Sequence, residues 1–391
     1  MSVVRPHGFR AAGVAAGIKS SGRPDLAVVV NDGPRFAAAG VFTRNKVKAA
    51  PVLWSQQVLA DGRLRAVVLN SGGANACTGA EGFQTTHTTA ERAAELLGAP
   101  GDEWGAIDVA VCSTGLIGAQ LPRDAVLAGV AAAVDVLAAD PDAGLAAASA
   151  VMTTDTVAKQ SAHVDPAGWS VGGFTKGAGM IAPSLATMLT VLTTDADLPA
   201  PALDAALRAA VRVSFDRLDI DGSMSTNDTV LLLASGASAV APDPAAFTAA
   251  LTAVCRDLAE QLQADAEGVT KRITVRVTGA VDEDDAVTVA RSVARDSLVK
   301  TALFGSDPNW GRVAAAAGYA DAELDPQRLD VTINGALLCR GGAVAGDRGS
   351  ADLSGKDVLV EVELGLGGGT AEIRTTDLSH AYVEENSAYS S

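Results

Sequence analysis

Short runs of apolar and β-branched residues along this chain predict buried strands, and most of the runs end at Gly, Asn or Asp, which favour turns. Residues 187–194, TMLTVLTT, are rich in β-branched side chains and predict a strand that begins at or near Thr187. The other predicted strands lie at residues 26–30, 66–70, 106–112, 272–279, 328–335 and 357–365.

Alanine-rich segments with apolar residues at helical spacing lie between these runs. The clearest is residues 244–268, which has a proline near its start and a glycine at its end. Further helices are predicted at residues 90–97, 123–137, 200–211 and 284–300. Because helices and strands mix without a regular βαβ alternation, the pattern predicts an α+β protein whose layered sheets are packed between helices.

Composition narrows the class of protein. The chain has 391 residues, of which 48% are hydrophobic, enough for a large core. Its formal net charge of -16 repels phosphate backbones and anionic membranes, so neither nucleic acid nor a membrane is an expected partner. The 4 cysteines and 4 histidines are scattered, which predicts no metal site and no disulfide framework and favours the cytoplasm.

One loop precedes a candidate nucleophile, Thr187. Lys176 opens the stretch KGAGMIAPSLAT, whose glycines and proline break regular structure just before the predicted strand at Thr187. A threonine hydroxyl is a poor nucleophile, but at the first residue of a chain the α-amine, with a pKa of about 7.7–8.0, is an adjacent general base. Attack of Thr187 on the Ala186 carbonyl, followed by hydrolysis of the ester, would create that amine. The alternative is an ordinary glycine-rich turn before a buried strand.

Other segments carry weaker signals. Thr114 and Gly115 follow a predicted strand, where backbone N–H groups and a hydroxyl could surround an oxyanion, although a plain strand exit has the same pattern. The loop at residues 70–82, NSGGANACTGAEG, fits either a polar ligand or a capped turn. Glu267 lies at the end of the long predicted helix, where a carboxylate is unfavourable without a specific partner.

Together these motifs resemble the glutamate N-acetyltransferase (ornithine acetyltransferase) family of arginine biosynthesis over nearly the whole chain. The resemblance rests on GIKSSGRPDLAVV, NSGGANACTGAEG, CSTGLIG, MTTDT, KGAGMIAPSLATML, DIDGSMSTNDTV, DAEGVTK, FGSDPNWGR and the ENSAYSS terminus. The chain departs from the usual motifs at Gly73, Ala178, Ser184 and Leu185, and no role is carried over to the side chains at 73, 178 and 184.

The resemblance implies a layered α/β sandwich and self-cleavage between Ala186 and Thr187. The products would be an α chain of residues 1–186 and a β chain of residues 187–391, which stay associated, commonly as α2β2. Thr187 would be the nucleophile, and Thr114 and Gly115 the oxyanion hole. The implied substrate site consists of Thr153, Lys176, Thr187, Glu267, Asn386 and Ser391.

The implied reaction is a ping-pong transfer that needs neither a metal nor a cofactor. Thr187 takes the acetyl group from N-acetylornithine, ornithine leaves, and glutamate then takes the acetyl group to give N-acetylglutamate. Lys176 is the expected partner of the α-carboxylate and Glu267 of the ornithine ammonium. The sequence leaves open whether acetyl-CoA is a second donor.

Three alternatives remain at this stage. A related acetyltransferase of clavam biosynthesis would have the same chemistry in another pathway. An N-terminal-nucleophile amidohydrolase or aminopeptidase would use water to resolve the acyl-enzyme. An amino-acid sensor that has lost catalysis is disfavoured by the intact Thr187, Thr114 and Gly115.

Overall fold

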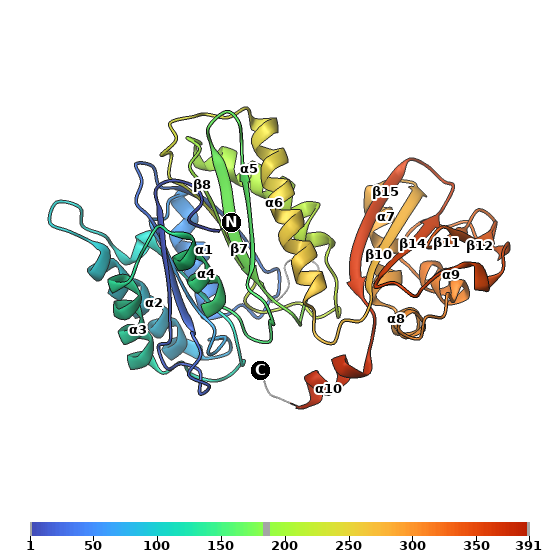
Figure 1. The fold of residues 1–391 in the computed structure, drawn as a ribbon, viewed down its shortest axis with the longest axis horizontal. Coiled ribbons are helices and arrows are strands. Elements are labelled where there is room, and N and C mark those ends of the chain that lie inside the picture. The colour runs from blue at the N-terminus through green and yellow to red at the C-terminus, as the bar shows by residue number, and fades with distance from the viewer. Residues whose placement is uncertain (1, 183–187, 389–391) are drawn as a thin grey trace.

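The computed structural model describes residues 2–182 and 188–388, which form two lobes (Figure 1). The larger lobe contains residues 2–182 and 188–270, and the smaller lobe contains residues 271–379. The last described helix, α10 (His380–Ala388), leaves the smaller lobe and lies below the junction of the two lobes in this view. No helix of the described residues is long and apolar enough to cross a bilayer.

Within the described residues, the larger lobe contains two sheets that pack between helices. The first has the strand order β1-β2-β4-β5 and the second the order β3-β9-β8-β7-β6. The strands of the first sheet are β1 (Phe9–Val14), β2 (Leu26–Asn31), β4 (Ala66–Asn70) and β5 (Val109–Ser113). Those of the second sheet are β3 (Ala37–Phe42), β6 (Lys159–Val164), β7 (Ser170–Lys176), β8 (Leu189–Thr194) and β9 (Thr229–Ala234).

The alternation of side chains along β9 shows how the layers are built. Leu231 and Leu233 belong to the apolar cluster that also contains the strands of the first sheet. Val230 and Leu232 point the other way, into the cluster formed with α5 (Ala200–Arg212) and α6 (Pro244–Ala264).

The outer side of the first sheet contacts α2 and α3, so the order of layers is helix, sheet, sheet, helix. This confirms the predicted α+β class with sheets packed between helices. The remaining helices of the larger lobe are α1 (Ala50–Val58), α2 (Gly79–Leu97), α3 (Arg123–Asp135) and α4 (Pro141–Ala150).

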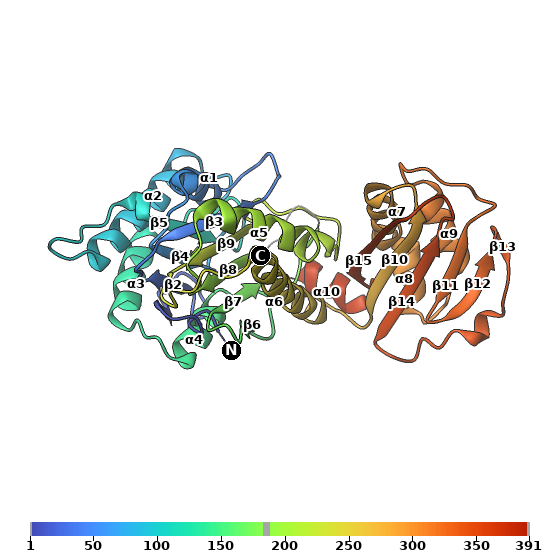
Figure 2. The same cartoon turned by 90° about the horizontal axis from the view of Figure 1, so that it is seen from above.

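The smaller lobe is built on a third sheet, of order β13-β12-β11-β14-β10-β15. Seen from above, this lobe lies beside α6, and α6 contacts β15 (Figure 2). Its strands are β10 (Arg272–Ala280), β11 (Asp330–Ile333), β12 (Ala336–Arg340), β13 (Ala343–Val344), β14 (Asp357–Glu363) and β15 (Gly369–Thr376). Its helices are α7 (Glu283–Arg295), α8 (Ser297–Phe304) and α9 (Trp310–Gly318).

The predicted elements are largely present, with instructive differences at their ends. The helix predicted at residues 284–300 is two helices, because Asp296 ends α7 and its carboxylate accepts the Val299 N–H at the start of α8. The strand β7, SVGGFTK, was missed because glycine has low strand propensity. A Cβ on Gly172 would lie 2.3 Å from the Ser2 carbonyl oxygen, so tertiary packing requires the glycine.

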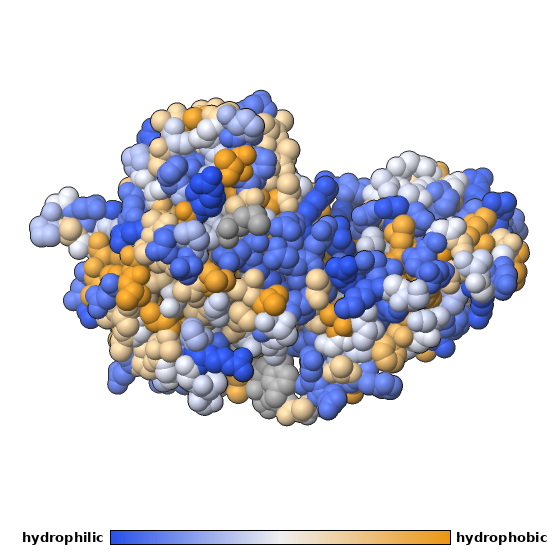
Figure 3. All heavy atoms as spheres, viewed as in Figure 1, coloured by the Kyte–Doolittle hydropathy of each residue, from blue (hydrophilic) through white to orange (hydrophobic). Residues whose placement is uncertain are grey.

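Charged and polar groups join the two lobes, and hydrophilic residues cover much of their junction on the face in Figure 3. The Lys300 Nζ on α8 donates to the Ile220 carbonyl at 2.5 Å and to Thr375 Oγ1 at 3.0 Å. Arg295 Nε donates to the buried Asp219 carboxylate at 2.6 Å. Burial lowers the pKa of Lys300 to about 8, although Asp221 and Asp219 oppose the change.

We expect replacement of Lys300 by Met to change how stability depends on pH. At pH values between about 8, the pKa of Lys300 in the folded chain, and 10.5, its ordinary value, Lys300 is protonated in the unfolded chain but not in the folded chain. The free energy of unfolding of the unsubstituted chain should therefore rise with pH, by about 2 kcal/mol more than that of Lys300→Met between about pH 7.5 and pH 9.5.

Urea titrations at the two pH values measure this difference, in a Thr187→Ala background that excludes the self-cleavage expected from the sequence. The control is Lys356→Met, which removes an exposed lysine of the same lobe and should keep the full pH dependence. Parallel pH dependence in Lys300→Met and its parent would contradict the assignment.

Candidate active site

A cavity in the larger lobe gathers residues that are far apart in the sequence. Thr114 and Gly115 follow β5, Lys176 ends β7, and Glu267 lies in the turn between α6 and β10. The cavity is lined by Ala74, Thr114, Gly115, Ile117, Thr153, Thr154, Lys176, Gly179, Met180, Ser225, Thr226, Asn227, Glu267 and Asn386. The side chains expected from the family resemblance within the described residues therefore share one cavity.

The backbone at Thr114 and Gly115 is fixed against the loop at residues 70–82. The Thr114 N–H donates to the Asn70 carbonyl at 2.9 Å. Gly115 has φ 130°, and a Cβ there would lie 2.8 Å from the Gly73 nitrogen, so only glycine fits. Asn227 Nδ2 donates to the Ser113 carbonyl at 2.8 Å and to the Ala74 carbonyl, which ties the strand end to the loop.

Most polar side chains of the loop at residues 70–82 have a structural role. Asn75 Nδ2 donates to the Gly82 carbonyl and to Thr86 Oγ1, both at 2.9 Å, and so holds the start of α2. Of this loop only Ala74 lines the cavity among the described residues. A structural turn is therefore the better interpretation for its asparagines and threonine, although Thr78 makes no side-chain capping bond to α2 and donates instead to Asn75 Oδ1.

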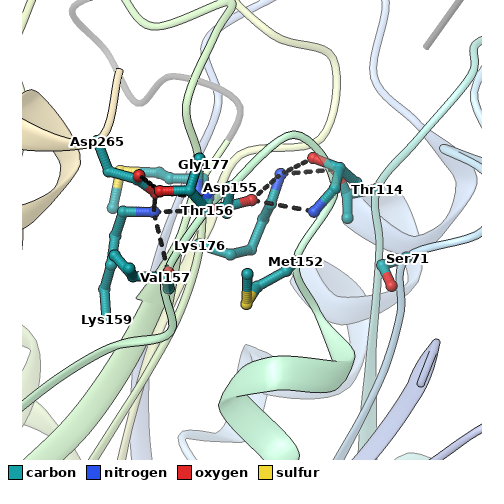
Figure 4. A network of polar contacts seen from close by, with 12 residues as sticks. Ser71, Thr114, Met152, Asp155, Thr156, Val157, Lys159, Lys176, Gly177 and Asp265 are labelled. Atoms are coloured by element: carbon teal, nitrogen blue, oxygen red, sulfur yellow. Dashed lines mark hydrogen bonds and ion pairs between the residues drawn. The ribbon is translucent and has the colours of Figure 1, made fainter. Parts of the chain in front are cut away.

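Lys176 lines the cavity and is buried, with 1% of its side chain exposed. Its Nζ donates to Thr153 Oγ1 at 2.7 Å. It also donates to Thr114 Oγ1 at 3.4 Å and lies 3.7 Å from Asp155 Oδ2 (Figure 4). Burial lowers the pKa of the Lys176 ammonium, and the Asp155 carboxylate opposes that change.

Asp155 is the centre of the charged network around Lys176. Its carboxylate accepts Lys159 Nζ at 2.7 Å, the Gly177 N–H at 2.6 Å and the Thr153 N–H at 3.0 Å. Burial by itself raises the pKa of Asp155, but Lys176 and Lys159 together hold it well below the ordinary value. Asp155 therefore stays ionised and positions both a side chain and the backbone of the KGAG turn.

Lys159 also pairs with a second carboxylate, that of Asp265. Its Nζ donates to Asp265 Oδ2 at 2.5 Å, and its side chain is 0% exposed. Two ammonium groups and two carboxylates thus alternate from Asp265 through Lys159 and Asp155 to Lys176 (Figure 4). A buried set of charges of this kind is stable only when every member is paired.

Glu267 faces the cavity from beyond the long helix. The helix α6 ends at Ala264, so the predicted position of Glu267 at the helix terminus is wrong by a short turn. Its N–H donates to the Ala178 carbonyl at 2.9 Å, and its Oε2 accepts Asn386 Nδ2 from α10 at 2.9 Å. A Cβ on Gly179 would lie 2.2 Å from that Oε2, so glycine lets the loop pass close to the carboxylate.

The described residues on both sides of residues 183–187 are held by carboxylates. Upstream, Asp221 accepts the Met180 N–H at 2.7 Å and the Ile181 N–H at 3.0 Å. Downstream, Asp228 Oδ1 accepts the Met188 N–H at 3.1 Å, and burial raises the pKa of Asp228 well above its ordinary value. Ala186, Thr187 and Ser391 themselves lie outside the described residues.

Sequence reasoning did not single out Asp155, Asp221 or Asp228. They lie inside the quoted motifs MTTDT and DIDGSMSTNDTV, and the density of Asp and Thr there is the one signal that could have drawn attention to them. Among the residues that the structure describes, no group of three or more His, Cys, Asp or Glu side chains could hold a metal ion.

Comparison with known proteins places the chain in a family. The ArgJ family model matches residues 10–391. The arginine biosynthesis bifunctional protein ArgJ of Mycolicibacterium paratuberculosis is 64% identical over 389 residues, which cover 100% of this chain and 96% of that protein. The protein of the same name from Streptomyces coelicolor is 59% identical over 391 residues, 100% of both chains.

A solved structure of ornithine acetyltransferase from Mycobacterium tuberculosis, complexed with ornithine, is also similar. It is 62% identical in sequence, and the match covers 48% of this chain and 96% of that chain with a TM-score of 0.46. The family match and the full-length relatives confirm the family predicted from the motifs. The chain therefore belongs to the ArgJ family of arginine-biosynthesis acetyltransferases.

Proposed function

We propose that this chain transfers an acetyl group from N-acetylornithine to glutamate through an acetyl-Thr187 intermediate. The observation that carries the proposal is the convergence of Thr114, Gly115, Lys176, Glu267 and Asn386 on one cavity. The described residues that flank 183–187 are anchored beside this cavity, and Met180 lines it. Such a site supplies oxyanion donors, a buried cation and a carboxylate for an amino-acid substrate.

Self-cleavage at Ala186–Thr187 would create the nucleophile. The Thr187 hydroxyl adds to the Ala186 carbonyl, the peptide nitrogen leaves as the α-amine, and water hydrolyses the ester to free the hydroxyl. The anchors on either side favour a fixed geometry for this attack. The α-amine of Thr187 then acts as general base for its own hydroxyl, while Thr114 and Gly115 hold the oxyanion.

The arrangement of strands explains why the two products would stay together. The α chain of residues 1–186 would supply β3, β6 and β7, and the β chain of residues 187–391 would supply β8 and β9. In the order β3-β9-β8-β7-β6, the strands of the β chain lie between those of the α chain. Separating the chains would break two strand pairs and expose both buried faces of the sheet, which supports a stable αβ unit. The proposed assembly, α2β2, consists of two such units.

Acetyl transfer follows from the same groups. Thr187 Oγ attacks the acetyl carbon of N-acetylornithine, the C–N bond breaks, and the nitrogen takes a proton as ornithine leaves. The glutamate amine then attacks the acetyl ester and Thr187 regains its proton. Because the relatives are named bifunctional, we include acetyl-CoA as a second donor for N-acetylglutamate synthesis, which an assay with acetyl-CoA and glutamate tests directly.

Two charged side chains of the cavity suit different charged groups of the substrates ornithine and glutamate. The positive charge of Lys176 attracts the α-carboxylate that both substrates share, and Thr153 lies beside it. Glu267 is the only carboxylate side chain among the described cavity-lining residues and suits the side-chain ammonium of ornithine. Asn386 and Ser391 complete the proposed substrate site near the end of the chain.

We expect the unsubstituted protein to consist of two fragments and the Thr187→Ala variant of one. Alanine removes the attacking hydroxyl, so cleavage and acetyl transfer should both be lost. Intact-mass measurement under denaturing conditions checks the cut between Ala186 and Thr187. Thr187→Ser keeps a hydroxyl and should still be cut, whereas a single uncut unsubstituted chain would remove the basis of the mechanism.

Replacing Glu267 by Gln should weaken use of N-acetylornithine more than use of glutamate. The amide keeps the size of the side chain and an oxygen for Asn386 Nδ2 but loses the negative charge that pairs with the ornithine ammonium. We expect KM for N-acetylornithine to rise about tenfold or more, the scale of a lost charged hydrogen bond. Equal losses for both substrates in steady-state assays would refute this pairing.

A further inference from the structure

The hydrogen bonds of Lys176 point to a role beyond attraction of a carboxylate. A lysine ammonium has three N–H donors and no acceptor. Among the described residues, three acceptors surround Nζ at the distances given above: the Thr153 hydroxyl, the Thr114 hydroxyl and the Asp155 carboxylate. Two donors therefore have a hydroxyl partner and the ammonium faces a carboxylate at 3.7 Å, so a substrate would compete with groups of the protein for Nζ.

The bond to Thr114 fixes what the threonine hydroxyl can do. A hydroxyl has one proton and two lone pairs, and an ammonium can only donate to it. The Thr114 proton is therefore directed away from Lys176, and the described residues provide no acceptor for it. Since Thr114 lines the cavity, this proton is available to an oxygen of the reacting group.

Asp155 holds Lys176 in place and favours its charged form. The carboxylate is 0% exposed and is shared with Lys159, which Asp265 also neutralises. Asp155 lies 3.7 Å from Lys176, but 2.7 Å from Lys159, so it does not fully neutralise the ammonium that faces the cavity. In a buried site, a positive charge next to a hydroxyl strengthens that hydroxyl as a donor.

We propose that Lys176 stabilises the oxyanion through Thr114, with Asp155 as the positioning residue that holds the ammonium against the hydroxyl. The inference rests on the proposed acetyl-Thr187 reaction. When negative charge develops on the acetyl oxygen, the Thr114 hydroxyl donates to it and the Lys176 charge stabilises it from behind. No proton leaves Lys176, and no bond to it forms or breaks.

The experiment compares two acetyl donors in the formation of acetyl-Thr187. N-acetylornithine has an α-carboxylate, and 4-nitrophenyl acetate has none. The cleaved forms of Lys176→Met, Thr114→Val and the double variant are quenched at short times, and the mass of the β chain reports acetylation. We expect each single change to lower the acetylation rate about 10²-fold with both donors, the usual cost of one oxyanion donor.

The double variant decides whether the two residues act as one unit. If Lys176 works through the Thr114 hydroxyl, the double variant should be no more than a few-fold slower than either single one. Multiplied losses would overturn the proposal. So would a Lys176→Met variant that keeps the full rate with 4-nitrophenyl acetate and shows only a raised KM for N-acetylornithine, since that result describes a carboxylate-binding lysine.

Asp155→Asn provides an independent test if the Lys176 variants are not cleaved. The amide keeps the shape of the carboxylate but loses the charge that holds Lys176. We expect about a tenfold slower acetylation by 4-nitrophenyl acetate when Thr114 is present and no further loss in the Thr114→Val background. Equal losses in both backgrounds would overturn the positioning role. Thr114→Ser, which keeps the hydroxyl, should stay within a few-fold of the unsubstituted enzyme.

These outcomes separate failure of the inference from failure of the proposed function. If cleaved, unsubstituted protein forms no acetyl-Thr187 with either donor, the acetyl-enzyme itself is refuted. If it forms acetyl-Thr187 readily and the Lys176 variants match its rate, only the link through Thr114 is refuted.

Discussion

The ion pairs of Asp155 are the interaction on which the cavity depends. A carboxylate removed from water is costly unless it is paired and hydrogen-bonded, and Asp155 meets that requirement with two lysines and two backbone N–H groups. Through these bonds it orients Lys176 and the first turn of the loop that leads toward Thr187. Among the described residues, loss of this one carboxylate would leave Lys159 with its ion pair to Asp265 and Lys176 with its two hydroxyl partners.

The smaller lobe supports the same site through hydrogen bonds to the larger lobe. Lys300 on α8 holds the Ile220 carbonyl, and the Ile220 N–H donates to the Ile181 carbonyl at 2.6 Å. The next residue, Asp221, accepts the N–H groups of Met180 and Ile181. The sheet of the smaller lobe contributes no lining residue among those described, yet its helix braces the loop before the proposed cleavage site.

The helix α10 contributes Asn386 to the lining of the cavity. α10 returns from the smaller lobe, and Ser379 Oγ donates to the Gly268 carbonyl at 2.6 Å. This contact brings Asn386 to Glu267, the carboxylate proposed for the ornithine ammonium, and Asn386 Nδ2 donates to its Oε2 at 2.9 Å.

The sequence by itself determined the α+β class, strands such as residues 66–70, and the family, because these follow from local periodicity and from motifs that are contiguous in the chain. It also predicted Thr114, Gly115, Lys176, Glu267 and Asn386 as site residues, and the structure places these five around one cavity. Only the tertiary structure determined which side chains contact one another. Asp155 forms ion pairs with Lys176 and Lys159. Lys159 also pairs with Asp265, which is 106 positions away in the sequence, because strand pairing and helix packing bring these side chains together. Ion-pair partners at such separations leave no periodic signal, so their chemistry depends on the fold.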